Sequence, residues 1–470
     1  MTFIKRFFTN SFGILFSRIF GFLRDLSMAS VLGASIYTDM FFVAFKFPNL
    51  FRRIFAEGAF TQVFMPSFIK SKYKSIFTFL ILRRFSIILI IFTLVVIMFS
   101  ELFTKLIAFG FDNSTIALTA SYLRINFLYL ILIFIVTLFS SLLQYKNHFA
   151  TTSFSTSLLN ISMISALLIF REYPPSDIVF YLSISVVIGG ILQLIAHLIA
   201  LKYKKLLKLF TIGFKAKKYK AKVSKNLKEF NKSFLPAILG NSTAQVSAFL
   251  DTWLASFLSA GSISYMFYSN RIFQLPLALF AIALSVAIFP KIAKLINKKQ
   301  IPEALTLLRK SFWFLLYLLT IATVGGIILS NEIVTLLFTR GAFSSTDALN
   351  TSNVLIMYMI GLIPYGISKI FLLWIYAHHN QKQAAKIAMY SLVSNVLLSV
   401  VLVLYMDVMG LALASSIAGI VLIFYILIHF GLRRFASFWD SKKFIILVVI
   451  ISLEIGLLLL AKPYITDLLQ

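Results

Sequence analysis

Hydrophobic runs of about 20 residues alternate with short polar segments along the whole chain. Runs of that length cross the apolar layer of a bilayer when they fold as α-helices. They lack the period-two alternation of membrane-spanning strands, which excludes a transmembrane β-barrel. The pattern predicts thirteen hydrophobic helices, over residues 11–32, 37–67, 85–104, 118–144, 151–170, 179–201, 233–258, 264–290, 311–330, 351–377, 384–405, 410–431 and 444–461.

Composition also indicates an all-α polytopic membrane protein. Of the 470 residues, 60% are hydrophobic and only 13% are charged, which is about half the charged share of a typical soluble protein. Cysteine is absent, which excludes disulfide and metal–thiolate chemistry. No cleavable secretory signal opens the sequence, so the first helix is expected to stay in the mature protein.

Most of the positive charge of the chain lies in the segments between the predicted helices. The formal net charge is +28, which in a soluble protein would suggest a nucleic-acid partner. When the amino terminus is placed in the cytoplasm, 32 Lys and Arg fall in cytoplasmic segments and 4 fall on the opposite side. This asymmetry predicts a cytoplasmic amino terminus, and it explains most of the basic charge without nucleic acid.

The longest polar segment, residues 202–232, contains twelve lysines interspersed with leucine, isoleucine and phenylalanine. Such a segment is typical of an amphipathic stretch that lies on an anionic inner leaflet. The alternative is a solvated linker whose charge only sets the topology.

An internal repeat appears when the sequence is shifted by 226 residues. Residues 25–42 then align without a gap on residues 251–268, and seven of 18 positions are identical, including Asp25 with Asp251. Six predicted helices separate the copies, so both copies have the same orientation in the membrane. The repeat predicts two parallel six-helix lobes around a central cavity, as in transporters. The predicted boundaries are an amino-terminal lobe at 1–201, the linker at 202–232, a carboxy-terminal lobe at 233–431 and an extra helix region at 432–470.

The predicted helices contain more cations than acids. An ionised side chain is costly in a bilayer, so the excess charge requires a water-filled cavity, mutual pairing or an anionic ligand. One alternative is that ion pairs such as Arg18–Asp25 only lock helices together. The excess of cations instead favours the binding of an anionic ligand. The planar guanidinium of arginine donates two parallel hydrogen bonds, which suits the oxygens of a pyrophosphate. The cations counted here are Arg18, Arg24, Lys46, Arg52, Arg53, Arg124, Arg271 and Lys369, and the acids are Asp25, Asp39, Glu57 and Asp251.

Enzyme signatures are missing from the sequence. The five histidines are scattered, and no HExxH, DDxxD, GxSxG, Walker or GxG-type motif occurs. The sequence therefore predicts a protein that is not an enzyme.

A drug or cation antiporter is disfavoured because a basic cavity repels cations, and a non-transporting scaffold would not need buried arginines. A membrane-embedded glycolipid transferase would need acids and bases on one face of a site.

Several long motifs resemble those of one known family. They are Ser17–Asp25, Phe41–Arg53, Phe55–Phe60, Asp251–Thr252 and Leu337–Phe343. Together they resemble the MurJ (MviN) lipid II flippase family, which belongs to the multidrug/oligosaccharidyl-lipid/polysaccharide (MOP) exporter superfamily. The resemblance runs along nearly the whole chain.

The resemblance implies a flippase of the bacterial inner membrane. Such a protein moves lipid II, the undecaprenyl-pyrophosphate-linked disaccharide-pentapeptide, to the periplasmic leaflet by alternating access. A flippase for O-antigen or capsule lipid-linked oligosaccharides is the alternative within the superfamily. The positions that match the cavity arginines are Arg18, Arg24, Arg52 and Arg271. Four further residues are expected to act as gate residues or to orient the cavity arginines: Asp25, Asp39, Glu57 and Arg53.

The resemblance also implies a sodium ion in some members, with the membrane potential as a further driving force. Asp251 and Asn395 match the sodium site, and Ser415 stands where a threonine is usual. Ser399 falls where a further carboxylate would be expected, which leaves few charged ligands for a hard cation. The family usually has fourteen helices, whereas this sequence predicts thirteen.

The charge asymmetry makes the topology testable in a chain without native cysteine. A cysteine placed in the 202–232 linker should resist a membrane-impermeant thiol reagent in intact cells and react after the cells are opened. A cysteine beside Arg171, on the opposite side, is the matched control and should react in intact cells. Labelling of the linker from outside would overturn the orientation.

Overall fold

The computed structural model describes residues 3–52 and 59–469, and within these ranges the chain forms helices and no strand. The chain divides into two compact units, Met1–Trp253 (unit 1) and Leu254–Gln470 (unit 2). The all-helical class predicted from the hydrophobic pattern is confirmed.

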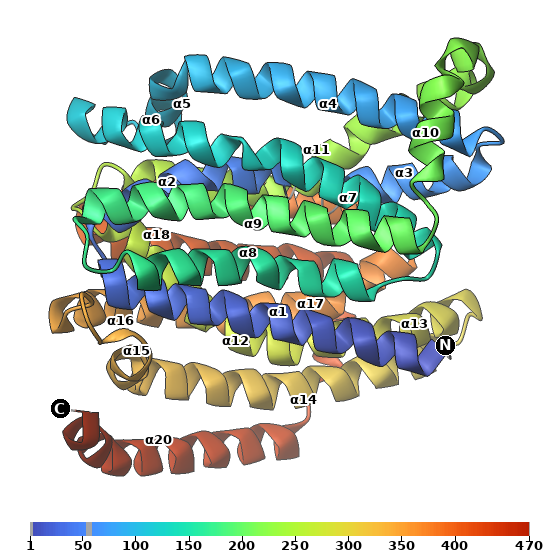
Figure 1. Cartoon of the computed structure of the whole chain (residues 1–470). Helices are drawn as coiled ribbons and strands as arrows, with labels where there is room; N and C mark the ends of the chain where they lie inside the picture. Colours follow the sequence, from blue (N-terminus) through green and yellow to red (C-terminus); the bar gives the residue numbers. More distant parts are fainter. Residues whose placement is uncertain (1–2, 53–58, 470) are drawn as a thin grey trace. The chain divides into compact units, whose positions relative to one another are not determined.

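In unit 1, helices far apart in the sequence pack side by side (Figure 1). Helix α1 packs along α8, α8 along α9, and α2 along α6. Side-chain caps define some of the helix starts: the Ser35 hydroxyl accepts the Thr38 N–H at 3.4 Å, and the Asp112 carboxylate accepts the Thr115 N–H at 2.8 Å. The helices are α1 (Phe3–Leu32), α2 (Ile36–Phe51), α3 (Ala59–Lys70), α4 (Lys74–Met98), α5 (Ser100–Ile107), α6 (Asn113–Phe127), α7 (Tyr129–Tyr145), α8 (Ala150–Ile169), α9 (Pro175–Tyr203), α10 (Lys208–Lys215), the 3₁₀ helix η2 (Lys217–Val223) and α11 (Ser224–Ala255), whose last two residues belong to unit 2.

Phenylalanine, of which the chain has 51, builds part of the core of unit 1. The ring centroid of Phe85 on α4 lies 5.8 Å from Phe60, 5.6 Å from Phe134 and 5.7 Å from Phe230. The four rings come from α3, α4, α7 and α11, and both stacked and edge-to-face pairs occur, as aromatic quadrupoles favour. This cluster fixes the start of α11 against the earlier helices.

Unit 2 is also built from helices. Ser344 and Asp347 form a reciprocal capping box at the start of α16. The elements are α12 (Ser262–Pro276), the π-helix η3 (Leu277–Ile282), α13 (Ala283–Asn297), α14 (Ile301–Ile328), α15 (Ser330–Phe338), α16 (Ser345–Ile360), α17 (Leu362–Ala377), α18 (Gln381–Phe430), α19 (Leu432–Ala436) and α20 (Ser441–Leu469).

The hydrogen-bond pattern of α18 runs through a sharp backbone break. Asp407 has φ +48° and ψ −134°, which is not a helical conformation. A Cβ on Gly410 would come within 2.3 Å of the Leu402 carbonyl oxygen, so only glycine permits this close approach. The break separates the two predicted helices at 384–405 and 410–431.

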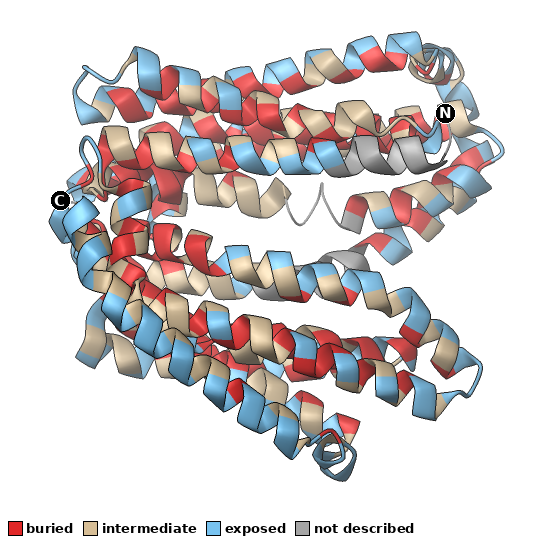
Figure 2. Cartoon of the chain, turned by 90° about the horizontal axis from the view of Figure 1, so that it is seen from below, coloured by how far each residue is buried: buried red, intermediate tan, exposed pale blue. Residues whose placement is uncertain are grey.

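Nine stretches of the described residues are long and apolar enough to cross a membrane. Their outward side chains are apolar, as on α4, where Ile88, Leu94 and Met98 are 58%, 59% and 70% exposed. Figure 2 shows such exposed residues along the outer faces of helices and buried ones where helices pack together. The multi-pass membrane class is thus confirmed, whereas the number thirteen stays a prediction.

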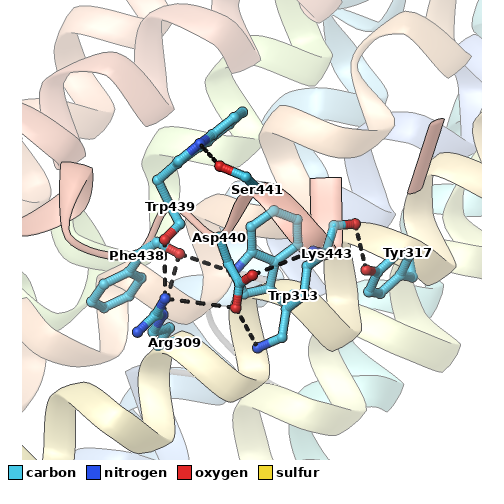
Figure 3. Close-up of polar contacts among 8 residues, drawn as sticks. All are labelled: Arg309, Trp313, Tyr317, Phe438, Trp439, Asp440, Ser441 and Lys443. Carbon is cyan, nitrogen blue, oxygen red and sulfur yellow. Dashed lines mark hydrogen bonds and ion pairs between the residues drawn. The ribbon is translucent and has the colours of Figure 1, made fainter. Parts of the chain in front are cut away.

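The last helix, α20, is held by side chains of α14 where it begins (Figure 3). The Trp313 indole N–H donates to the Phe438 carbonyl oxygen at 2.9 Å, and Arg309 Nε donates to the same oxygen at 3.3 Å. The Tyr317 hydroxyl donates to the Lys443 carbonyl oxygen at 2.6 Å. These bonds satisfy backbone carbonyl groups near the turn that leads into α20.

Asp440 completes this junction. Its carboxylate lies 3.4 Å from Lys443 Nζ and 3.7 Å from Arg309 Nη2. The pKa of Asp440 lies below its ordinary value, chiefly because the Lys443 backbone N–H donates to the carboxylate and also because the two cations lie nearby.

The far end of α20 is held by the buried acid Glu332 of α15. Thr466 donates its hydroxyl to Glu332 Oε1 at 3.0 Å, and Lys462 Nζ lies 3.7 Å from the same oxygen. Lys462 also donates to the Ile328 carbonyl oxygen at 2.8 Å. Polar contacts at both ends therefore dock a helix on which Leu447 is the one side chain described as buried.

We predict that Trp313→Ala lowers the free energy of unfolding in detergent by about 3–5 kcal/mol, because it removes a buried ring and the shorter of the two hydrogen bonds to the Phe438 carbonyl oxygen. Phe314→Ala is the matched control, since Phe314 follows directly in α14 and is 56% exposed. Thermal unfolding of the purified variants measures both effects. Equal losses would contradict the docking role of Trp313.

Candidate functional site

A buried ion pair on α1 forms the centre of the candidate site. Asp25 is fully buried, and its Oδ1 accepts from Arg24 Nη2 at 2.6 Å and from Arg24 Nε at 3.1 Å. Arg24 Nη1 donates to Asn160 Oδ1 of α8 at 3.2 Å, and the Arg24 side chain is 14% exposed. An arginine has five N–H donors, and these contacts use three of them. The pair thus fixes the plane of the Arg24 guanidinium.

Asn160 supports this arrangement from the neighbouring helix. It is buried, and its amide group donates to the Ser17 carbonyl oxygen at 3.4 Å while its oxygen accepts from Arg24. Sequence reasoning missed Asn160. The sequence did contain a signal for it, which is an amide side chain in an otherwise apolar helix. Polar groups buried inside a membrane need hydrogen-bond partners, so such an amide indicates a polar contact.

Arg18 does not form the ion pair considered above. It is exposed on α1, and within the described ranges it makes no hydrogen bond or ion pair. Seven helical residues separate Arg18 from Asp25 by about 10 Å along the axis, although both lie on one face. Asp25 instead pairs with its neighbour Arg24, so the Arg18–Asp25 pairing is wrong.

Helix α2 carries the other predicted residues of unit 1. Asp39 is buried in the first turn, where the positive end of the helix dipole favours a carboxylate. Arg52, at the opposite end, donates from Nε and Nη2 to Asn49 Oδ1 at 3.0 Å and 2.8 Å. The predicted residues Arg53 and Glu57 lie outside the described residues.

Lys46 joins α2 to α11 in unit 1. Its Nζ donates to the Thr252 hydroxyl at 2.9 Å, and Thr252 is buried beside Asp251. Asp251 Oδ1 is buried and accepts no hydrogen bond from any described residue. The sequence marked Lys46 as an intramembrane cation but indicated no partner for it, because 206 residues separate Lys46 from Thr252.

The remaining predicted residues belong to unit 2. Arg271 is half-buried on α12. Asn395 and Ser415 meet across the break in α18, where the Asn395 amide donates to Ser415 Oγ at 3.1 Å. Ser399 is buried nearby in sequence, and its hydroxyl has no hydrogen-bond partner among the described residues.

These contacts do not test the expected sodium site. Unit 2 brings the Asn395 amide nitrogen to Ser415 Oγ, whereas the expected carboxylate, Asp251, belongs to unit 1. No cluster of three His, Asp or Glu side chains able to hold a metal occurs in the described part of the chain. The sodium site therefore stays a prediction.

The helical fold is similar to that of known membrane transporters. A multidrug resistance MATE family transporter of the MOP superfamily, in an inward-facing conformation, is similar in structure, with a TM-score of 0.73. The match covers 89% of this chain and 95% of that transporter at 13% sequence identity, so it shows the fold alone.

The sequence identifies the family within this class. A profile of the family "Lipid II flippase MurJ" matches residues 28–468. A probable lipid II flippase MurJ from Helicobacter pylori is 46% identical over 94% of this chain and 98% of its own length. A relative of the same name from Aquifex aeolicus is 34% identical over 81% of this chain and 74% of its own length. A solved structure of the lipid II flippase MurJ, in an inward closed conformation, has a TM-score of 0.79 at 26% identity and covers 98% of both chains. The chain belongs to the MurJ family, as its motifs predict.

The two arginines of α1 should differ in their effect on stability. Arg24→Ala leaves the buried Asp25 without its ion-pair partner, so we expect the free energy of unfolding to fall by about 3–5 kcal/mol. Arg18→Ala is the matched control and should change it by less than about 0.5 kcal/mol. Arg24→Ala/Asp25→Ala should recover much of the loss, because buried pairs are less costly to remove whole. Thermal unfolding in detergent measures all three, and equal losses for the two single variants would refute the assignment.

Proposed function

We propose that this protein moves lipid II from the cytoplasmic to the periplasmic leaflet of the bacterial inner membrane. The observation that carries the proposal is the 46% identity, over nearly the full length of both chains, with a probable lipid II flippase. The relatives are named as flippases, which agrees with the expected transporter rather than an enzyme. The amino terminus is proposed to be cytoplasmic because of the charge asymmetry.

The charged side chains of α1 and α2 support an anionic substrate. Residues 18–52 contain four cations, Arg18, Arg24, Lys46 and Arg52, and two acids, Asp25 and Asp39. A net positive charge inside a membrane protein is stabilised by an anion that enters the same space. The pyrophosphate of lipid II supplies such an anion, while its polyprenyl tail stays in the lipid.

Arg24 is best arranged for this role. Asp25 and Asn160 hold three of its donors, which leaves two N–H groups of a pre-oriented fork for phosphate oxygens. In this proposal Asp25 orients Arg24, and Arg18, Arg52 and Arg271 are further contacts to the headgroup. Asp39, Arg53 and Glu57 act as gate residues.

Transport is proposed to follow alternating access. A substrate shifts the balance between inward-facing and outward-facing states only through different affinity for the two states. The ion pair gives a physical route, because a pyrophosphate on the two remaining N–H groups of Arg24 shares this guanidinium with Asp25. The sodium ion at Asp251, Asn395 and Ser415 and the membrane potential stay predictions, and no step depends on them.

A strain depleted of its own flippase tests the proposal. Arg24→Ala, Arg52→Ala and Arg271→Ala should each lower lipid II translocation by roughly 10- to 100-fold, because each removes charged hydrogen bonds to the phosphates. Arg→Lys should restore only part of the rate, since the charge returns without the bidentate fork. A leaflet-specific lipid II assay at matched protein levels is the measurement.

Arg171→Ala is the control, because Arg171 pairs with the exposed Glu172 in the loop between α8 and α9. Its translocation rate should equal that of the wild type. Full translocation by the triple arginine-to-alanine variant would refute the anion site, and normal lipid II translocation after depletion of this protein would refute the function.

A further inference from the structure

The segment between the end of α9 and the first turn of α11 has an unusual charge distribution. Residues 202–228 contain eleven lysines and no acidic residue. The lysines of α10 and η2 are exposed, including Lys215, Lys217, Lys218 and Lys222. Nothing in the proposed transport mechanism uses this charge.

The segment is a docked part of unit 1 rather than a free linker. Gly213 of α10 packs so closely on α4 that an added Cβ would lie 2.3 Å from the Ser75 carbonyl oxygen. Beyond η2, Val223, Leu227 and Phe230 are buried, and Phe230 contacts the ring of Phe77 on α4. Lys70 and Glu229 add an ion pair at 2.9 Å. The orientation of α10 and η2 on unit 1 is therefore fixed by packing.

The outward side of this segment is both apolar and cationic. Ile212, Phe214 and Tyr219 are 53%, 55% and 47% exposed, and one side of the Phe214 ring contacts Phe79 of α4 at 5.7 Å between centroids. The ammonium groups lie over these rings: Lys217 is 4.4 Å from the centroid of Phe214, and Lys222 is 5.0 Å from that of Tyr219. We name Ile212, Phe214 and Tyr219, with the lysines of 215–222, the basic-aromatic face.

The connections of the segment place this face near the membrane surface. Helix α9, a candidate membrane span, ends at Tyr203, and α10 begins at Lys208. Five residues reach at most about 18 Å, so α10 cannot leave the surface by more than that. It also packs on the first residues of α4, which is another candidate span.

We propose that the basic-aromatic face binds an anionic lipid surface, with its exposed rings in the interfacial layer and its lysines on the lipid phosphates. Aromatic and aliphatic side chains next to lysines are the composition of interfacial segments on anionic leaflets. A nucleic acid would also attract the lysines, but it would leave three large apolar side chains exposed beside a bilayer. The inference does not depend on the transported substrate.

A fluorescent probe on this face tests the proposal in the full-length chain. Ile212→Cys gives a single cysteine that can be labelled with bimane, since the chain has none of its own. In phosphatidylcholine nanodiscs that contain phosphatidylglycerol, we expect blue-shifted emission and at least about twofold stronger quenching by nitroxide-labelled lipid than in pure phosphatidylcholine. High salt should reduce this difference, because exposed charges are screened.

Matched lysine variants distinguish an effect of the basic-aromatic face from an effect of the positive charge of the protein as a whole. Replacement of Lys217, Lys218, Lys220 and Lys222 by Gln should remove the difference between the two nanodiscs, since each lysine near an anionic surface contributes roughly fivefold. Replacement of Lys291, Lys294, Lys298 and Lys299, which are exposed at the end of α13, should leave it unchanged.

Equal emission in both nanodiscs for the labelled wild-type chain would overturn the proposal, whatever the variants do. The same shift on addition of inorganic phosphate to phosphatidylcholine nanodiscs would show a phosphate site rather than a lipid surface. A shift produced only by added RNA would overturn it in favour of a nucleic acid. Lipid II translocation by the wild type is measured separately, so failure here leaves the transport function intact.

Discussion

The constraint that organises unit 1 is the cost of placing charge inside apolar helices. Asp25 is fully buried, and the structure stabilises it with an adjacent arginine that an amide from α8 also holds. The acid and the amide together fix the plane of the Arg24 guanidinium. A second cation, Lys46, is held by a hydroxyl on α11. Charge compensation thus ties α1 to α8 and α2 to α11.

The hydrophobic pattern predicted the helices well, because span length and apolar composition are local properties. Even the break in α18 is visible in the sequence, as two predicted helices separated at 406–409, where the backbone turns at Asp407. The partners of the charged residues could not be predicted in the same way. Asn160 and Thr252 lie 136 and 206 residues from the cations that they contact, and only the packing of helices brings them together. The alternative of an Arg18–Asp25 pair fails because the axial distance between the two residues is too long, although both lie on one helix face.

The predicted boundaries of the two lobes stay a prediction. The sequence places a linker between two repeats at 202–232, whereas the compact units divide after Trp253. The physical reason is that α10, η2 and the first half of α11 pack on α3 and α4 through Gly213 and the phenylalanine core.

The repeat also shows how two related acids acquire different roles. Asp25 and Asp251 occupy equivalent positions, but the residue before Asp25 is Arg24 and the residue before Asp251 is Leu250. The first acid therefore has a cation one residue away and holds its guanidinium. The second has a buried oxygen that accepts no hydrogen bond from the described residues, with the Lys46 ammonium bound to the neighbouring Thr252. The carboxylate of the first copy therefore pairs with an arginine of its own helix, whereas in the second copy the cation bound to the adjacent threonine lies on another helix.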